Sequence, residues 1–173
     1  KKSAYLSIFK ASIEMVNDSV AIGKPKPMSY KLNGQSHTGP VCLSADGNTM
    51  YFTRVAKGEK VKGTKTVAKP KLFASVLNNG KWDNAEMLTF CTEDASYGHP
   101  SVSADGKTLY FTSDMSSGKG GKDIYKVERQ GDSWGTPTNL GSDVNTSGNE
   151  MFPSYHKGAL YYSSDGMQGE GGL

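Results

Sequence analysis

The side chains best suited to chemistry in this sequence are aspartates that recur at matching places along the chain. They are Asp46, Asp105, Asp114, Asp123 and Asp165. Two carboxylates that hydrolyse a glycoside must converge to about 5–9 Å, whereas residues repeated once per structural unit spread apart. A Ca²⁺ loop needs alternating acidic ligands over about 12 residues, and that pattern is missing from the sequence. We therefore expect these carboxylates to cap turns, and no metal or other cofactor is predicted.

The histidines and serines give no better case for catalysis. His37, His99 and His156 fall at different places in the repeated units described below, without the spacing of a zinc site. The sequence has no Gly-x-Ser-x-Gly nucleophile elbow. The glycine-rich run 118–122 could cradle a phosphate, but it lacks the spacing of a phosphate-binding loop. We predict that the chain is not an enzyme.

Cations are concentrated between Arg54 and Lys71, where Glu59 is the sole acid. Two interpretations stay open for this segment: a solvated loop, or an electrostatic contact with an acidic partner protein or an anionic envelope polymer. Its use of lysine disfavours bidentate recognition of phosphate, which is a property of arginine. The candidate partner-binding residues of the segment are Lys57, Lys60, Lys62, Lys65 and Lys69.

Composition excludes several classes of protein. The chain has 173 residues with a formal charge of +3, and only Arg54 and Arg129 are arginines, which argues against nucleic acid as a partner. No stretch approaches the roughly 20 apolar residues of a membrane helix, and no apolar N-terminal run marks a signal peptide. Aromatic residues make up 10% of the chain, which is too many for a disordered protein. Cys42 and Cys91 leave the disulfide state and the redox compartment open.

An internal repeat organises the chain. Residues 39–53 match residues 99–112, and a third, shorter copy covers 152–165. A second block, 80–88, matches 132–140, so that 52 residues separate Trp82 from Trp134. A period near 50 residues is typical of one four-stranded blade of a β-propeller.

Each copy is predicted to contain four strands. Strand one follows the repeat proline and ends at an Asp-Gly turn such as 105–106. Strands two and three are expected over 108–112 and 123–127, and strand four over 134–140. The N-terminal region fits the same scheme, with 6–10 as strand three and 22–33 as strand four.

The predicted fold class is all-β: a β-propeller segment of four-stranded antiparallel blades, with two full blades and two partial ones. We expect one domain over 1–173, divided into the end of a blade (1–36), two blades (37–90 and 97–141) and the start of a blade (148–173). The chain is then expected to be a piece of a longer propeller whose number of blades stays open. His37, Tyr97 and Glu150 each lie three residues before a strand-one proline. Since strand one is innermost in a propeller, these residues are candidates for partner binding at a mouth of the central channel.

At this level of detail the sequence resembles a known family. The run 100–114, followed by Gly-Gly-Lys-Asp-Ile-Tyr at 120–125, resembles the TolB-type, WD-like β-propeller repeat. The runs 134–137, 140–145 and 149–153 resemble the variant found in OmpA-family envelope proteins of Bacteroidota, one group of which is similar to the component that links the type IX secretion system to peptidoglycan. The first full copy departs from the pattern in two ways: it carries an insertion from Arg54 to Lys71, and it has Lys71-Leu72-Phe73 in place of Asp-Ile-Tyr.

The resemblance implies a non-catalytic scaffold for protein–protein interaction in a periplasmic, outer-membrane-associated assembly. Its partners would be envelope proteins, and peptidoglycan would be bound only through an OmpA-like domain that these residues do not include. No nucleic-acid partner and no transmembrane segment are expected. The alternative is a substrate-binding or gating propeller of a peptidase or glycan-active enzyme, and carbohydrate or ion binding in the channel is a third hypothesis.

Overall fold

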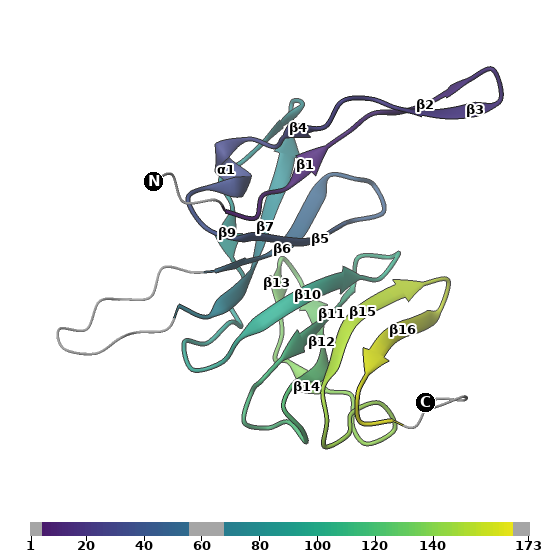
Figure 1. Ribbon diagram of the computed structural model, residues 1–173. Coiled ribbons are helices and arrows are strands. Elements are labelled where there is room, and N and C mark those ends of the chain that lie inside the picture. Colours follow the sequence, from purple (N-terminus) through teal and green to yellow (C-terminus); the bar gives the residue numbers. More distant parts are fainter. Residues whose placement is uncertain (1–4, 56–67, 168–173) are drawn as a thin grey trace.

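The computed structural model describes residues 5–55 and 68–167, which form an arrangement of antiparallel β-sheets (Figure 1). These residues build two five-stranded sheets and three two-stranded sheets. The single helix among them, α1 (Tyr30–Asn33), has four residues, and none of the described helices is long and apolar enough to cross a membrane. The all-β prediction is confirmed.

One five-stranded sheet is built from the second full copy of the repeat. It consists of β10 (Tyr97–Val102), β11 (Thr108–Ser113), β12 (Asp123–Gln130), β13 (Ser133–Trp134) and β14 (Thr138–Asn139). The order is β10-β11-β12, and both β13 and β14 pair with β12. The continuous strand four expected over 134–140 is therefore two short pieces, because the register shifts between them: Trp134 pairs with Arg129 and Thr138 with Lys126, so that four positions face three on β12.

The first full copy of the repeat folds in the same way. Its sheet contains β5 (Thr38–Leu43), β6 (Thr49–Val55), β7 (Pro70–Asn78), β8 (Lys81–Trp82) and β9 (Glu86–Met87), with β8 and β9 both pairing with β7. The third copy contributes a hairpin of β15 (Glu150–His156) and β16 (Ala159–Ser164). The repeat is thus real in three dimensions, and the predicted division of the chain at 36, 90, 97, 141 and 148 stays a prediction.

The N-terminal region contains a feature that the sequence did not predict. β1 (Phe9–Lys10) pairs with β4 (Lys26–Pro27), as expected of strands three and four. Between them, β2 (Ile13–Val16) and β3 (Ser19–Ile22) form a hairpin that projects from the rest of the molecule (Figure 1). The turn residues Asn17 and Asp18 have φ values of 48° and 60°, as the tight hairpin turns require. Of the stretch 22–33, only Lys26–Pro27 is strand four, since Ile22 belongs to β3 and 30–33 is helix α1.

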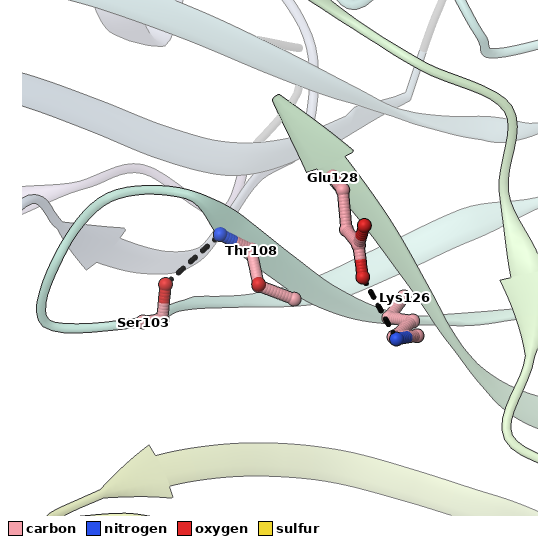
Figure 2. Close-up of polar contacts among 4 residues, drawn as sticks. All are labelled: Ser103, Thr108, Lys126 and Glu128. Atoms are coloured by element: carbon pink, nitrogen blue, oxygen red, sulfur yellow. Dashed lines mark hydrogen bonds and ion pairs between the residues drawn. The ribbon is translucent and has the colours of Figure 1, made fainter. Parts of the chain in front are cut away.

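The turns between strands one and two are closed by side chains. In the turn before β11, Ser103 Oγ donates to Asp105 Oδ1 (2.6 Å), and the Thr108 N–H donates to Ser103 Oγ (2.9 Å; Figure 2). The same contacts recur in the turn before β6, where Ser44 Oγ donates to Asp46 Oδ1 and the Thr49 N–H donates to Ser44 Oγ. Turn capping is thereby confirmed for both aspartates.

The core lies where neighbouring sheets meet. Tyr51 and Leu72 of one sheet join Tyr97, Phe111 and Tyr125 of the next in a single buried cluster. A second cluster joins the N-terminal region to β6, through Ile8, Leu32, Met50 and Phe52. Since burying one large apolar side chain contributes about 1.5–3 kcal/mol, each sheet is stabilised chiefly by the sheets beside it.

Candidate functional site

The strand-one segments β5, β10 and β15 pack beside one another, with β10 between the other two. Each strand is interrupted by a register shift near its start: between Thr38 and Val41, between Gly98 and Ser101, and between Met151 and Ser154. A bulge of this kind bends the strand and redirects a side chain. The three shifts therefore shape the same edge of the molecule. We call this edge, formed by residues 38–41, 98–101 and 151–154, the rim.

Two bulge residues at the rim have an unusual backbone conformation. His99 and Phe152 have φ values of 53° and 57°, in the left-handed region that non-glycine residues avoid. Their rings stack with centroids 4.2 Å apart, and the His99 N–H donates to Thr53 Oγ1 (3.0 Å). Strain of about 1–3 kcal/mol per residue is typically kept at functional sites, so this pair marks the rim as a candidate site.

A cavity of about 180 Å³ lies beside His99. We call it the rim pocket, and it is lined by Thr53, Pro70, Ser96, Tyr97, Gly98, His99, Thr112, Ser113, Asp114, Lys122 and Met151. The lining comes from five strands, β6, β7, β10, β11 and β15, and from the segments beside them. The pocket is therefore held by the rigid part of the fold.

The polar groups around the rim pocket include two that have no partner. His99 Nδ1 and Thr112 Oγ1 are buried and make no hydrogen bond to any of the described residues. Burial lowers the pKa of His99, and the nearby charge of Lys122 lowers that pKa further. The imidazole is therefore neutral at pH 7, and it can accept or donate a hydrogen bond if a ligand or partner side chain enters.

The structure corrects the alignment on which His37 was chosen. Tyr97 pairs with Ser113 and Glu150 pairs with Ser164, whereas Thr38, not His37, pairs with Arg54 at the matching position of β6. The reason is one additional residue between Pro40 and the next Asp-Gly turn, compared with the copy that starts at Pro100. The unequal lengths of the two copies, 39–53 and 99–112, already carried this signal.

Tyr97 and Glu150 lie in the interior, with no exposed side-chain surface. The Tyr97 hydroxyl accepts a hydrogen bond from the Thr92 N–H (3.2 Å). The Glu150 carboxylate accepts from the Thr146 N–H (2.9 Å), Thr146 Oγ1 (2.7 Å) and Ser164 Oγ (2.6 Å). Both side chains hold the segments that lead into strand one, and a direct role for either in partner binding stays a prediction.

His37 is exposed at the rim. Its Nδ1 accepts a hydrogen bond from the Leu6 N–H (3.2 Å), and its ring meets Tyr5 edge to face at 5.6 Å. A partner can reach this imidazole without any rearrangement of the core. Its contribution to binding also stays a prediction.

Of the basic segment, Lys57, Lys60, Lys62 and Lys65 lie outside the described residues. Lys69 is described, and its ammonium donates to the Asp94 carbonyl. Two further cations of the segment are structural: the Arg54 guanidinium lies 4.8 Å from the ring centre of Phe73, and the buried Lys71 ammonium donates to the Thr92 and Ala95 carbonyls. Arg54 and Lys71 should therefore be left out of any electrostatic contact surface.

The glycine-rich loop before β12 already binds a carboxylate of the protein. Asp123 is buried and accepts from the Lys119 N–H (2.6 Å), the Gly120 N–H (3.1 Å) and Asn139 Nδ2 (2.7 Å). Asp114 and Asp165 likewise accept backbone N–H groups, from Ser96 and Asn149. Turn capping is therefore confirmed for Asp46 and Asp105, whereas Asp114, Asp123 and Asp165 accept backbone N–H groups of other segments.

No group of three or more His, Cys, Asp or Glu side chains within 5–55 and 68–167 is placed to hold a metal ion. Cys42 and Cys91, both described, are free thiols. Burial raises the pKa of each thiol to about 11.

A second cavity, of about 370 Å³, lies at the seam between the two five-stranded sheets. Arg129 crosses this seam: its Nη2 donates to the Tyr51 hydroxyl (3.1 Å), and its guanidinium lies 4.7 Å from the Trp134 ring centre. Tyr51 and Trp134 also meet edge to face at 5.9 Å. The seam is thus a packing contact between sheets, with an acidic margin from Asp83 and Asp132.

Comparison with known proteins supports the fold and little more. No protein-family model and no curated protein sequence matches this chain. Among solved structures, TolB of Agrobacterium tumefaciens aligns with 86% of this chain and 47% of its own, at 17% identity and a TM-score of 0.50. TolB of Acinetobacter baumannii aligns with 86% of this chain and 35% of its own, also at 17% identity, with a TM-score of 0.42. This chain thus spans less than half of either TolB chain. The Agrobacterium likeness shows that the sheets are blades of a β-propeller segment, as the sequence predicted.

Proposed function

We propose that this chain is a non-catalytic propeller scaffold that binds a partner protein at the rim. The observation that carries the proposal is the stacked, strained pair of His99 and Phe152 beside the rim pocket. Phe152 is 53% exposed, so a large aromatic surface faces solvent on a rigid strand. Anchors of this kind, aromatic and held in place before binding, contribute most of the affinity at protein interfaces.

The partner surface that fits this rim is apolar at its centre and acidic at its margin. Phe152, Met151 and Pro70 supply apolar surface, while Lys122 and Lys69 add positive charge. Lys57, Lys60, Lys62 and Lys65 would extend that charge by their place in the sequence. Opposite charges at the margin would raise the rate of association and make it sensitive to salt.

The setting of this assembly is proposed from the sequence resemblance. The repeat variant at 134–153 supports a periplasmic protein of the OmpA-family type, associated with the outer membrane and similar to the type IX secretion component. Peptidoglycan would be contacted only through another domain. Fractionation of the cells that make this protein tests the setting, and recovery in the cytoplasm would contradict it.

Site-specific photo-crosslinking tests the rim. A photoreactive phenylalanine analogue placed at Phe152 should crosslink one envelope protein, and unlabelled chain should compete with that product. The same analogue at Tyr30, which is 69% exposed on α1 and does not line the rim pocket, is the matched control. Equal products from both positions, or none from Phe152, would refute partner binding at the rim.

A further inference from the structure

Asparagine followed by glycine occurs twice in the sequence, at Asn33-Gly34 and at Asn79-Gly80. In such a pair the backbone nitrogen of the glycine can attack the side-chain carbonyl carbon of the asparagine, because glycine has no side chain to hinder the approach. The attack closes a succinimide ring and expels the side-chain nitrogen as ammonia. The two pairs have the same intrinsic chemistry, so that any difference between them in the folded protein comes from the fold.

The fold holds both reacting groups of the first pair in hydrogen bonds. Asn33 is 8% exposed, its Oδ1 accepts from the Ile8 N–H (2.7 Å), and its Nδ2 donates to the carbonyls of Ile8 (3.1 Å) and Met28 (3.0 Å). The Gly34 N–H, which must lose its proton before it attacks, donates to the Tyr30 carbonyl (2.8 Å). The Asn33 carboxamide therefore cannot turn towards Gly34 until its own hydrogen bonds break.

The second pair is open to solvent. Asn79 and Gly80 form the turn between β7 and β8, beside the paired residues Asn78 and Lys81. Their φ values are 48° and 73°, which both central residues of a type I′ turn require. Both residues are exposed. In the described part of the chain, Asn78 donates to Asp83 Oδ2, whereas neither the Asn79 carboxamide nor the Gly80 N–H has a hydrogen-bond partner.

We propose that Asn79 is a site of spontaneous deamidation in the folded protein and that Asn33 is protected. The Gly80 nitrogen loses its proton to hydroxide and forms a bond to the side-chain carbonyl carbon of Asn79. The bond from that carbon to the amide nitrogen breaks, and ammonia leaves. Water then opens the succinimide at one of its two carbonyl carbons. Opening at the side-chain carbonyl gives aspartate, and opening at the main-chain carbonyl gives isoaspartate.

The reaction requires rotation of the Asn79 side chain and backbone until the two atoms meet. Only the end of a hairpin opposes this rotation, because β8 consists of Lys81–Trp82 and is paired at those two positions. The ends of short, exposed hairpins open at little cost in free energy. Asn33 lies in α1 beside Leu32, which is 0% exposed, so that the same rotation there would disturb the core.

The modification would change the turn and its surroundings. Aspartate adds a negative charge to a hairpin that already carries Asp83. Isoaspartate adds a carbon to the main chain, so that the turn loses the length that sets the register of β7 and β8. Next to this turn, Trp82 packs against the second core cluster, the one around Leu32 and Phe52. The isoaspartate form should therefore loosen the contact between this blade and the N-terminal region.

Peptide mapping by mass spectrometry tests the site. The folded chain and the chain in guanidinium chloride are incubated side by side at mildly alkaline pH, and trypsin then places the two Asn-Gly pairs in different peptides. In denaturant, Asn33 and Asn79 should gain the mass of an acid in place of an amide at similar rates. In the folded protein, the rate at Asn33 should be at least about ten-fold lower than at Asn79, because buried hydrogen bonds must break first.

Two outcomes of this experiment would overturn the proposal. One is equal rates at Asn33 and Asn79 in the folded protein. The other is an unchanged Asn79 in the folded protein with modification of both residues in denaturant, since the turn would then protect its asparagine. Asn79→Gln is the matched control: its longer side chain disfavours ring closure, so the turn peptide should keep its mass while Asn33 behaves as in the parent protein.

Urea unfolding followed by tryptophan fluorescence tests the effect on packing. The isoaspartate-containing fraction, separated by ion exchange, should unfold at a lower urea concentration than Asn79→Asp, which carries the charge without the additional main-chain carbon. Equal midpoints would contradict the loosening of Trp82. Neither Asn79 nor Gly80 lines the rim pocket, so the tests of the turn and of the rim can fail separately.

Discussion

Asn145 and Lys71 hold equivalent junctions of two blades from opposite sides. Asn145, in the segment after strand four, reaches back to the Ile124 backbone of strand three. In the neighbouring blade it is Lys71, in strand three, that reaches forward to the Thr92 and Ala95 carbonyls of the segment after strand four. The departure of Lys71-Leu72-Phe73 from the Asp-Ile-Tyr pattern is therefore a change of hydrogen-bonding partner, with the blade geometry preserved.

Replacement of Asn145 should be among the most destabilising polar changes in the protein. Asn145→Ala leaves the Ile124 N–H without a partner at a site where Asn145 is 1% exposed, and it removes the Asn145 donor from the Ile124 carbonyl, which then keeps only the Leu140 N–H. We expect a loss of about 3 kcal/mol in the free energy of unfolding, since each buried polar group left unpaired costs about 1–3 kcal/mol. Urea unfolding followed by tryptophan fluorescence measures it. Asn84→Ala, an exposed change, is the control, and equal midpoints for the two variants would refute the role of Asn145.

Glu150 should be needed as a hydrogen-bond acceptor more than as a space-filling side chain. Glu150→Ala removes the acceptor for the Thr146 N–H, Thr146 Oγ1 and Ser164 Oγ. We expect a loss of roughly 3 kcal/mol, because hydrogen bonds to a charged group contribute about 1.5–3 kcal/mol. Glu150→Gln keeps one acceptor oxygen and should recover part of the loss in thermal unfolding. A glutamine variant no more stable than the alanine variant would count against this explanation.

Stability should fall as the pH drops below the ordinary histidine pKa of 6.5, and His99 should account for part of that fall. Burial and Lys122 lower the pKa of His99 in the folded state, so the unfolded chain binds the proton more readily. The contribution of a neutral His99 to stability is therefore fully present above pH 6.5, the ordinary histidine pKa, and it is lost as the pH falls through the lowered pKa of the folded state. Urea midpoints should be measured from about pH 7.5 to about pH 5, a range that spans the ordinary histidine pKa. They should decline less steeply for the His99→Gln variant than for the parent protein. Parallel curves for variant and parent would contradict the assignment.

Neither native thiol should react while the protein is folded. Burial raises the pKa of Cys42 and Cys91 to about 11, so almost no thiolate is present near pH 8. Treatment with a maleimide, followed by mass spectrometry, should give no adduct in buffer and two adducts in denaturant. One rapidly formed adduct under native conditions would show that a thiol is more accessible than its packing indicates.

The sequence predicted the features that depend on local chemistry. The Asp-Gly turns depend on residues that are close in the sequence, and the 52-residue spacing of Trp82 and Trp134 reports one repeat after another along the chain. From those features the fold class and the order of the strands could be predicted. They also made the capping role of the aspartates predictable, because an Asp beside a Gly turn has N–H groups within reach.

What the sequence did not predict depends on register and packing. One additional residue before the turn at Asp46 shifted the first copy, so that Thr38 took the place expected of His37. The bulges that put His99 and Phe152 in the left-handed region arise from the pairing of whole strands, and a single residue type does not signal them. The division of strand four also comes from a register shift, because the first full copy is divided in the same way with Ala85 in the place of Pro137. The rim pocket is lined by residues of five strands, and no linear pattern in the sequence signals it.

The loop around Asp123 carries its own anion. Its N–H groups point at a carboxylate supplied by the next strand, in the way that backbone nests elsewhere enclose a phosphate or sulfate. One substitution at position 123 would exchange an internal negative charge for a vacancy between Lys119 and Lys122. Asp123 thus fills, with a charge of the protein itself, the place that an external anion takes in such a nest.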